Sequence, residues 1–394
     1  MKIDGDDFRV LPGKAVDLAK RPTMIKPLYK SRKHYAALIG QHIAELTVQQ
    51  SLLYANNSHS LLLVFQAMDA AGKDSAIKHV MSGVNPQGCQ VFSFKHPSAE
   101  ELEHDFLWRT TRCLPERGQI GIFNRSYYEE VLIVRVQPEI LRSEGLPSET
   151  LAAKDLWQQR YRSISDLERH LHHNGTRVIK FFLHLSKEEQ RRRFLRRIDE
   201  PDKNWKFSMD DVEQRKSWTH YQEAYEECLA ATSTIDSPWY AVPADDKQNT
   251  HLIISQIMLD ALQGLRMSYP QSDRARQREL QAIRNEFDSG ATSEAETAAT
   301  IRKTLGETGE LLDPHTAVAY AIAASVNDPQ SAIVTLATAH PAKFPDAVAK
   351  ASGIRPALPP RLNHLLKAEE RFTVLPNSHE AVRNFILSSP KARH

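Results

Sequence analysis

A lysine, two carboxylates and several small residues lie close together between Gln66 and Ser75, in the order Gln-Ala-Met-Asp-Ala-Ala-Gly-Lys-Asp-Ser. Five apolar residues, 61–65, precede this segment and are typical of a buried parallel strand, and a helical pattern follows it. At such a strand–turn–helix junction the loop N–H groups and the helix dipole attract an anion, and the Lys73 ammonium can reach a terminal phosphate. The spacing therefore predicts a site for phosphoryl transfer.

This segment departs from the Walker A pattern G-x-x-x-x-G-K-[ST] at two positions. Ala67 replaces the first glycine, and Asp74 replaces the Ser/Thr, which leaves the Ser75 hydroxyl one residue late. The usual Mg²⁺ ligand is therefore missing. Asp69 is the candidate to replace it, because Mg²⁺ prefers one or two carboxylates together with substrate phosphates and water. The alternative is an ordinary β-turn-α junction with a solvent-facing lysine.

A second apolar run, 119–123, ends in the polar residues Asn124, Arg125 and Ser126. Because the carboxyl ends of parallel strands face the ligand crevice, these side chains are expected beside the phosphate loop. Asn124 occupies the place of a Walker B aspartate, so Glu129 and Glu130, about one turn further on, are the candidates for the missing carboxylate. A solvated helix start is the alternative for Glu129 and the expectation for Glu130.

Arginines are concentrated around this second strand and in a later helical pattern. The run 191–197 places like charges four residues apart at 192/196 and 193/197, an arrangement that an anionic partner would relieve. The loop 199–208 and a capping signature at Ser208 follow, in the layout of a kinase lid over about 187–210. Solvated faces are the alternative, but so many arginines beside one phosphate loop favour a polyanionic substrate, because the arginine fork pairs with phosphate oxygens.

Strand-like and helical patterns alternate along the first two thirds of the chain. The strand-like runs are 61–66, 90–94, 119–123, 176–184 and 239–243. Helical patterns lie at 34–56, 76–82, 98–113, 149–173, 186–199, 208–234 and 248–266. This alternation predicts an α/β fold with a parallel sheet covered by helices on both faces.

Length and composition bound the other possibilities. With 394 residues the chain is expected to form two domains: 1–267 with an irregular N-terminal arm, and a module at 289–394, joined by a linker helix at 268–288. With a net charge of +2, neither a nucleic-acid coat nor polybasic membrane binding is implied, and we expect neither partner. The three scattered cysteines and the absence of a long apolar run favour a cytoplasmic protein without disulfides.

Three separated motifs resemble the polyphosphate kinase 2 family over roughly residues 20–268. They are Val64–Asp74, Phe123–Val131 and Trp205–Ser208. The resemblance implies a P-loop, three-layer α/β/α kinase-like domain with a helical lid, and transfer of a terminal phosphoryl group between inorganic polyphosphate and nucleoside mono- or diphosphates (AMP/ADP, GMP/GDP). It also implies Mg²⁺, with Mn²⁺ as a substitute, nucleoside triphosphates as further partners, and a homo-oligomer, either a dimer or a tetramer.

Carried over by position, the resemblance assigns roles to individual residues. Catalytic or metal-organising roles fall to Asp69 (the Mg²⁺ ligand), Lys73, Asn124, Arg125 and Glu129. Phosphate or nucleotide contacts fall to Ala70, Ala71, Gly72, Asp74, Ser75, Arg112, Arg117, Arg193, Arg197 and Lys206.

The remaining third of the chain resembles the C-terminal part of threonine synthase, in the segments Leu311–Val318 and Leu336–Pro345. A small α/β module is expected, with a helix at 294–307 and a strand at 332–337. The lysine that binds pyridoxal phosphate in that family lies in a portion that this chain lacks. We therefore expect no pyridoxal phosphate, structural roles for His315, His340 and Lys343, and a docking or oligomerisation surface.

Three other functions remain open at this point. An ATP-dependent kinase for a small metabolite would use the same scaffold, although the excess of arginine argues against it. A polyphosphate- or nucleotide-binding regulator would have lost turnover through the changes at Ala67 and Asn124. Threonine synthase activity conflicts with the missing cofactor lysine.

Overall fold

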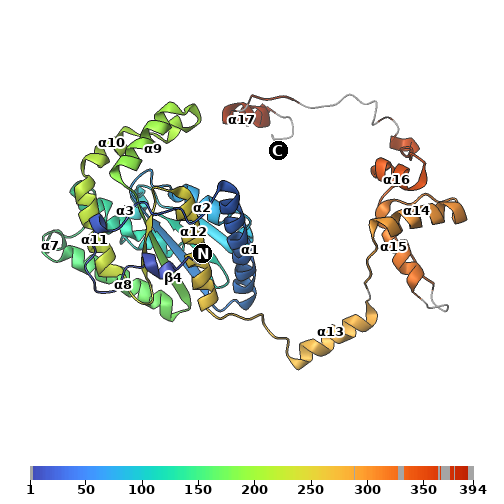
Figure 1. Ribbon diagram of the computed structural model, residues 1–394, viewed down its shortest axis with the longest axis horizontal. Coiled ribbons are helices and arrows are strands. Elements are labelled where there is room, and N and C mark those ends of the chain that lie inside the picture. The colour runs from blue at the N-terminus through green and yellow to red at the C-terminus, as the bar shows by residue number, and fades with distance from the viewer. Residues whose placement is uncertain are drawn as a thin grey trace. The chain divides into compact units, whose positions relative to one another are not determined.

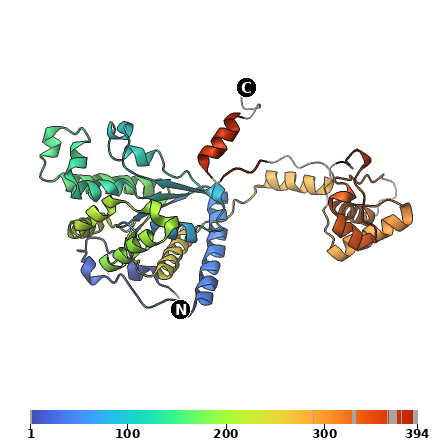
Figure 2. The same cartoon turned by 90° about the horizontal axis from the view of Figure 1, so that it is seen from above.

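The computed structural model describes residues 3–287, 289–326, 332–362, 364, 373–376 and 378–388 (Figures 1 and 2). The chain divides into two compact units, Met1–Gln271 and Ser272–His394. No helix in the described ranges is both long and apolar enough to cross a membrane.

The first unit contains a five-stranded parallel sheet in the order β2-β3-β1-β4-β5. The strands are β1 (Ser60–Gln66), β2 (Cys89–Ser93), β3 (Ile120–Asn124), β4 (Thr176–His184) and β5 (Trp239–Pro243). All five predicted strands are present within one residue of their predicted bounds. The α/β prediction with a parallel sheet is therefore confirmed.

Helices cover both faces of this sheet. One face of the sheet is covered by α1 (Arg32–Asn56), α2 (Lys73–Val80) and α12 (Lys247–Gly264). The opposite face is covered by η4 (Tyr127–Val131), α5 (Ile133–Val136), α8 (Leu156–His173) and α11 (Trp218–Thr232). The remaining helices of this unit are α3 (Ala99–Leu102), α4 (Trp108–Thr111), α6 (Pro138–Arg142), α7 (Ser148–Leu151), α9 (Lys187–Asp199) and α10 (Met209–Lys216).

Side-chain alternation along β1 creates the two cores. Leu61, Leu63 and Phe65 pack towards α1, α2 and α12, whereas Leu62 and Val64 pack towards α8 and α11. Every residue of β1 is buried. Because successive strand residues point to opposite faces, a strand with five consecutive apolar residues must be covered on both sides, which explains the three layers.

The predicted helix 98–113 is interrupted in the structure. Ser98 and Glu101 form a capping box that starts α3. The Asp105 carboxylate then accepts a hydrogen bond from the Leu107 N–H at 2.9 Å. This local turn competes with helical hydrogen bonding, so the chain turns before α4 begins.

Two helices form the predicted lid region. Figure 1 shows α9 and α10 side by side, projecting from the sheet, with the short helix η5 (Pro201–Lys206) between them. Ser208 caps α10 by accepting from the Asp210 N–H at 3.1 Å. The Asp211 carboxylate pairs with Arg197 at 3.2 Å.

The described part of the second unit is helical. Its helices are α13 (Arg274–Glu286), α14 (Glu294–Thr308), α15 (Pro314–Ser325), α16 (Pro345–Ser352) and α17 (His379–Ser388). Ile301, Ala317 and Ala351 form a small core. The strand predicted at 332–337 is wrong, because these residues pair with no other strand. A strand is stable only where a neighbour bonds its N–H and C=O groups, and the described part of this unit offers none.

Candidate active site

The loop between β1 and α2 has the backbone of a phosphate cradle. Ala70 and Gly72 have positive φ angles of 62° and 101°. Gly72 suits this conformation because it lacks a Cβ, whereas Ala70 holds it at a cost in strain. No side chain caps the first turn of α2. The free N–H groups at that turn and the helix dipole therefore leave a place for an anion.

Lys73 is held over this loop. Its Nζ donates to the Ala67 carbonyl at 3.0 Å. Burial and the nearby Arg125 lower the pKa of Lys73, and the carboxylates of Asp69, Glu129 and Asp74 oppose that shift. The Lys73 ammonium thus lies among groups of both charges, and the negative charge of a phosphate group can attract it away from them.

Asp69 and Arg125 form an ion pair across two strand ends, with a guanidinium nitrogen of Arg125 3.2 Å from Asp69 Oδ1. The pairing of Phe65 with Asn124 in the sheet brings the two loops together, and the Arg125 N–H donates to the Phe65 carbonyl at 3.0 Å. Arg125 has a φ of 64°, an unusual angle for a residue with a Cβ. Such strain at a strand end is typical of functional sites.

Asn124 and Glu129 lie near this ion pair. The Asn124 amide donates to Asp74 Oδ1 at 2.8 Å, so it orients a carboxylate at the position where Walker A loops have Ser/Thr. Burial raises the pKa of Glu129, while Arg125 and Lys73 act in the opposite direction. The five residues predicted to be catalytic, Asp69, Lys73, Asn124, Arg125 and Glu129, therefore lie together at one edge of the sheet.

Arg193 does not occupy the position predicted for it as a phosphate contact. Its side chain is 5% exposed, and its Nε donates to Glu189 at 2.8 Å. Its two terminal nitrogens donate to the carbonyls of Ala70, Ala71, Ala244 and Asp245, at 3.0, 2.7, 2.6 and 3.2 Å. All five N–H donors are thus used within the protein, which makes Arg193 a positioning residue for the phosphate loop.

Arg117 also does not lie where a phosphate contact was predicted. It precedes β3, whereas the phosphate loop follows the carboxyl end of β1, and these strands are parallel. A strand of five residues spans roughly 15 Å, so Arg117 lies at the opposite edge of the sheet. It cannot contact a phosphate in the loop.

The other predicted phosphate contacts differ in their positions. Arg112 is exposed and stacks on Trp108 at 4.5 Å, and it does not line the cavity described below. Arg197 pairs with Asp211 in the lid. Ser75 lies in the first turn of α2, and the side chain of Lys206 falls outside the described part of the structure.

A cavity of about 440 Å³ is lined by residues that follow β2 and β3, among them Arg125, which pairs with Asp69 of the phosphate loop. We call it the β3-side cavity. Its lining includes Arg109, Arg125 and Glu129, together with an apolar wall that contains Phe106 and Ile133. The volume and the mixture of apolar and polar walls suit a nucleotide-sized ligand. Sequence reasoning noted Arg109 as one of several arginines but did not assign it to the site.

Glu130 is buried rather than solvated, with 5% of its side chain exposed. Its Oε1 lies 3.0 Å from Arg160 Nε, and Glu144 lies 3.6 Å from another nitrogen of the same guanidinium. Two carboxylates thus share one cation. Burial and the Glu144 charge raise the pKa of Glu130 to about 8.

We expect Glu130→Gln to flatten the dependence of stability on pH. In the folded protein Glu130 keeps its proton up to about pH 8, whereas the unfolded group loses it near 4.5, so the wild type loses stability as pH rises between these values. Glutamine does not titrate. Urea unfolding at several pH values measures the effect, with the exposed Glu149→Gln as control. Parallel curves for wild type and Glu130→Gln would contradict the assignment.

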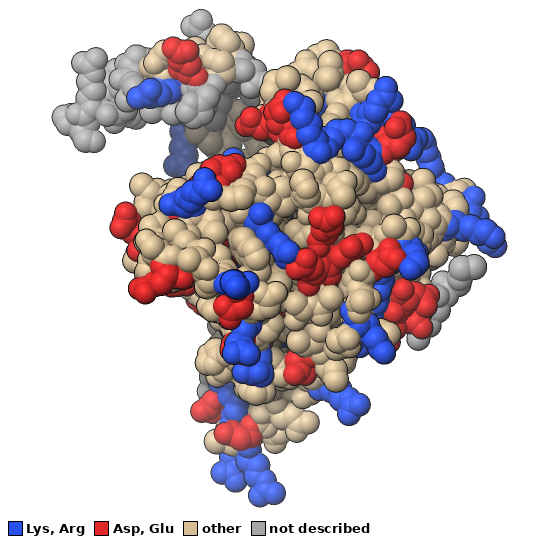
Figure 3. Space-filling view, turned by 90° about the vertical axis from the view of Figure 1, so that its left-hand side faces the viewer, with Lys and Arg blue, Asp and Glu red and all other residues tan. Residues whose placement is uncertain are grey.

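Surface charge gives no simple guide to this site. On the face drawn in Figure 3, Lys and Arg side chains are interspersed with Asp and Glu, as the net charge of +2 implies. This face therefore offers no broad basic surface to an anion.

Comparison with known proteins adds independent information. Residues 29–270 match the family model "Polyphosphate kinase 2 (PPK2)", and residues 316–386 match "Threonine synthase, C-terminal". An ADP-polyphosphate phosphotransferase of Rhodopseudomonas palustris is 62% identical over 287 residues, which cover 73% of this chain and 99% of that protein. An AMP/ADP-polyphosphate phosphotransferase of Meiothermus ruber is 47% identical, covering 57% and 80%.

A solved structure agrees with these matches. The crystal structure of polyphosphate kinase 2 from Arthrobacter aurescens superimposes with a TM-score of 0.63 at 37% identity. The match covers 71% of this chain and 96% of that one.

Proposed function

The chain belongs to the polyphosphate kinase 2 family, and we propose that it transfers a terminal phosphoryl group between inorganic polyphosphate and a nucleoside mono- or diphosphate. The convergence of Asp69, Lys73, Asn124, Arg125 and Glu129 beside one anion-binding loop is the observation that carries this proposal. Family membership supplies the substrate class, and the two relatives named above are described as phosphotransferases of ADP, or of AMP and ADP.

The two substrates meet at the phosphate loop. The N–H groups of the loop and of the first turn of α2 bind the transferring phosphate, and Lys73 neutralises its charge. The β3-side cavity binds the acceptor nucleotide, and Arg125, which lines it, is the cation we assign to the acceptor phosphate. Because phosphoryl transfer needs little covalent help from the protein, positioning and charge neutralisation account for most of the rate.

The residues present fit a divalent metal that is shared with substrate. No cluster of three or more His, Cys, Asp or Glu side chains able to hold a metal occurs in the part of the chain that the structure describes. Mg²⁺ typically binds proteins through one or two carboxylates and the substrate phosphates, and Asp69 is the carboxylate we assign to it. When bound, Mg²⁺ would neutralise charge on the phosphate oxygens.

One assay tests the proposal. Purified protein is incubated with Mg²⁺, long-chain polyphosphate and, separately, AMP, ADP, GMP or GDP, and the nucleotide products are quantified. We expect one or more of these acceptors to gain a phosphoryl group at the expense of polyphosphate. Binding of polyphosphate without turnover on any acceptor would favour a regulator, and use of ATP but not polyphosphate as donor would favour a small-metabolite kinase.

The second unit has no assigned task in this reaction. His315 pairs with Asp313 and packs on Phe344, and His340 Nδ1 accepts from the Ala342 N–H at 3.1 Å. These local contacts support structural roles. Its use as a docking or oligomerisation surface, the dimeric or tetrameric state and a cytoplasmic location stay predictions.

A further inference from the structure

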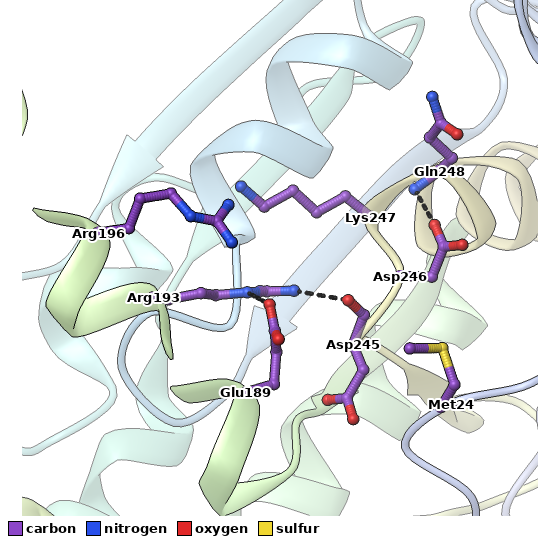
Figure 4. Close-up of a pocket in the computed structure, with 8 residues that line it drawn as sticks. All are labelled: Met24, Glu189, Arg193, Arg196, Asp245, Asp246, Lys247 and Gln248. Carbon is purple, nitrogen blue, oxygen red and sulfur yellow. Dashed lines mark hydrogen bonds and ion pairs between the residues drawn. The ribbon is translucent and has the colours of Figure 1, made fainter. Parts of the chain in front are cut away.

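Helix α1 is held against the first unit along its whole length. Figure 4 shows Asp246 among the residues that line a pocket of about 330 Å³ at the carboxyl edge of the sheet. This carboxylate accepts from the Tyr29 hydroxyl, just before α1 begins, at 2.9 Å. In the middle of the helix, His42 Nδ1 and the Ser255 hydroxyl of α12 are 2.7 Å apart, and at the far end a short turn joins α1 to β1. The face of α1 that points away from α12 is therefore a surface of fixed geometry.

This outward face of α1 differs in composition from an ordinary solvent-exposed helix face. Among the described residues between Lys33 and Asn57, no exposed side chain is charged. The exposed residues there are Ala36, Ala37, Gly40, Gln41, Ala44, Val48, Ser51 and Tyr54. Glu45, the one acidic residue of the helix, is half-buried and accepts from Gln41. The outward face of α8, by contrast, exposes both arginine and aspartate. Because surface helices normally present charged side chains to water, the face of α1 has the composition of a surface that another helix covers.

Gly40 forms a notch in this face. A Cβ added to it would meet no described atom within 4 Å, so no described part of the chain requires a glycine there. Glycine weakens a helix interior relative to alanine, and its main structural advantage is that another chain can approach it closely. Val48, about two turns further on, projects from the same face and is 59% exposed. The face thus carries one notch and one projecting aliphatic side chain.

A second copy of α1 that runs antiparallel fits this relief. A two-fold axis at Ala44 sets Gly40 of one copy opposite the partner's Val48, so each valine enters a notch. The same axis sets Ala37 opposite the partner's Ser51. Each pair occurs twice, since a two-fold contact uses the same patch on both copies. Small residues at the other positions allow the helix axes to approach to about 8 Å, the short end of helix packing distances.

The charges at the ends of α1 favour the same arrangement. Arg32 and Lys33 lie in the first turn, where the helix dipole is positive, and no acidic residue accompanies them. The last turn, where the dipole is negative, has no basic residue. An antiparallel partner brings the two cations of one copy to the C-terminal carbonyls of the other, which satisfies both ends at once. A parallel partner would instead place like ends together.

We propose that the outward face of α1 is the contact between two copies of this chain, which pack antiparallel about a two-fold axis at Ala44. The proposal does not depend on the proposed function, because this face lies outside the phosphate loop and the β3-side cavity. It assigns the expected homo-oligomer one interface and one orientation.

Sedimentation velocity of the full chain over a range of concentrations measures the association. Ala44→Glu sets two like charges against each other at the axis, and we expect it to raise the dimer dissociation constant at least about a hundredfold. Gly40→Leu fills the notch and should raise the constant at least about tenfold. The controls are Ser163→Glu, at an exposed position of α8, and Gly306→Leu, at an exposed glycine of α14 whose added Cβ also meets no described atom within 4 Å. Circular dichroism checks that every variant keeps its helices.

Disulfide cross-linking tests the register of the two helices. With copper(II) phenanthroline as oxidant, Ala44→Cys is expected to give a disulfide-linked dimer, because the axis brings the two copies of this position together. Ala37→Cys alone should not, because it faces the partner's Ser51, and the double variant Ala37→Cys/Ser51→Cys should restore the link. The wild type, with its three native cysteines, gives the background.

Three outcomes would overturn the proposal. The first is a wild type that stays monomeric at every concentration, and links from Lys33 to the second unit in cross-linking mass spectrometry would then show that the chain covers this face itself. The second is a dimer whose dissociation constant is the same in the wild type and in Ala44→Glu, since its interface must lie elsewhere. The third is a disulfide formed by Ala37→Cys as readily as by Ala44→Cys, which indicates a parallel pair.

Discussion

Lys73→Ala is expected to lower kcat by at least about a hundredfold, since it removes the ammonium that neutralises the transferring phosphate. The loss falls on turnover rather than on folding. Lys73 makes one hydrogen bond to the Ala67 carbonyl, and its burial is unfavourable for its charge, as its lowered pKa shows. Steady-state rates at saturating polyphosphate and nucleotide measure the effect.

Lys78→Ala is the matched control for this variant. Lys78 lies in the same helix and is exposed to solvent. It removes the same charge without touching the phosphate loop, so its turnover should equal that of the wild type. Thermal unfolding of Lys73→Ala should show a folded protein. Turnover in Lys73→Ala comparable with that of Lys78→Ala would rule out the assignment of the phosphate site.

Arg193→Ala is expected to destabilise the first unit by about 3 kcal/mol or more, because removing one partner of a buried, hydrogen-bonded ion pair leaves uncompensated polar groups. The groups that lose Arg193 as a donor are the Glu189 carboxylate and four backbone carbonyls from two loops. Urea unfolding followed by tryptophan fluorescence measures the free energy of unfolding.

Arg192→Ala provides the comparison for Arg193. Arg192 is the preceding residue of α9 and also pairs with Glu189, at 3.1 Å, but its side chain is 57% exposed. Exposed ion pairs contribute less than about 1 kcal/mol. Arg193→Lys should fall between the two, because lysine keeps the charge but has three donors instead of five. If Arg193→Ala loses no more stability than Arg192→Ala, the positioning role is wrong.

These two predictions distinguish a role in phosphoryl transfer, for Lys73, from a role in holding the phosphate loop in place, for Arg193. We propose that Lys73 acts on the substrate, whereas Arg193 of α9 donates to the carbonyls of the loop. A phosphate cradle needs both, because its N–H groups bind an anion only when the backbone is held in its strained conformation.

Local sequence determined the sheet and the centre of the site. Apolar runs bounded by turns predicted all five strands. Burial on both faces explains the apolar runs of the central strands β1 and β3, whereas the edge strand β2 is largely exposed. The lysine after a glycine at a strand end identified the phosphate loop, since that chemistry is written in consecutive residues. Asn124, Arg125 and Glu129 followed from the rule that parallel strands end at one edge.

Only the tertiary structure decided what the arginines and buried acids do. Arg117 and Arg193 carry the same charge as a phosphate-binding arginine, but one lies at the wrong edge of the sheet and the other donates to Glu189 and to four backbone carbonyls. Glu130 looked solvated because its burial comes from α8, far along the chain. The strand expected at 332–337 lacks a partner in the described residues of its unit. Charge and apolarity are properties of single residues, whereas burial and pairing depend on which distant segments the fold brings together.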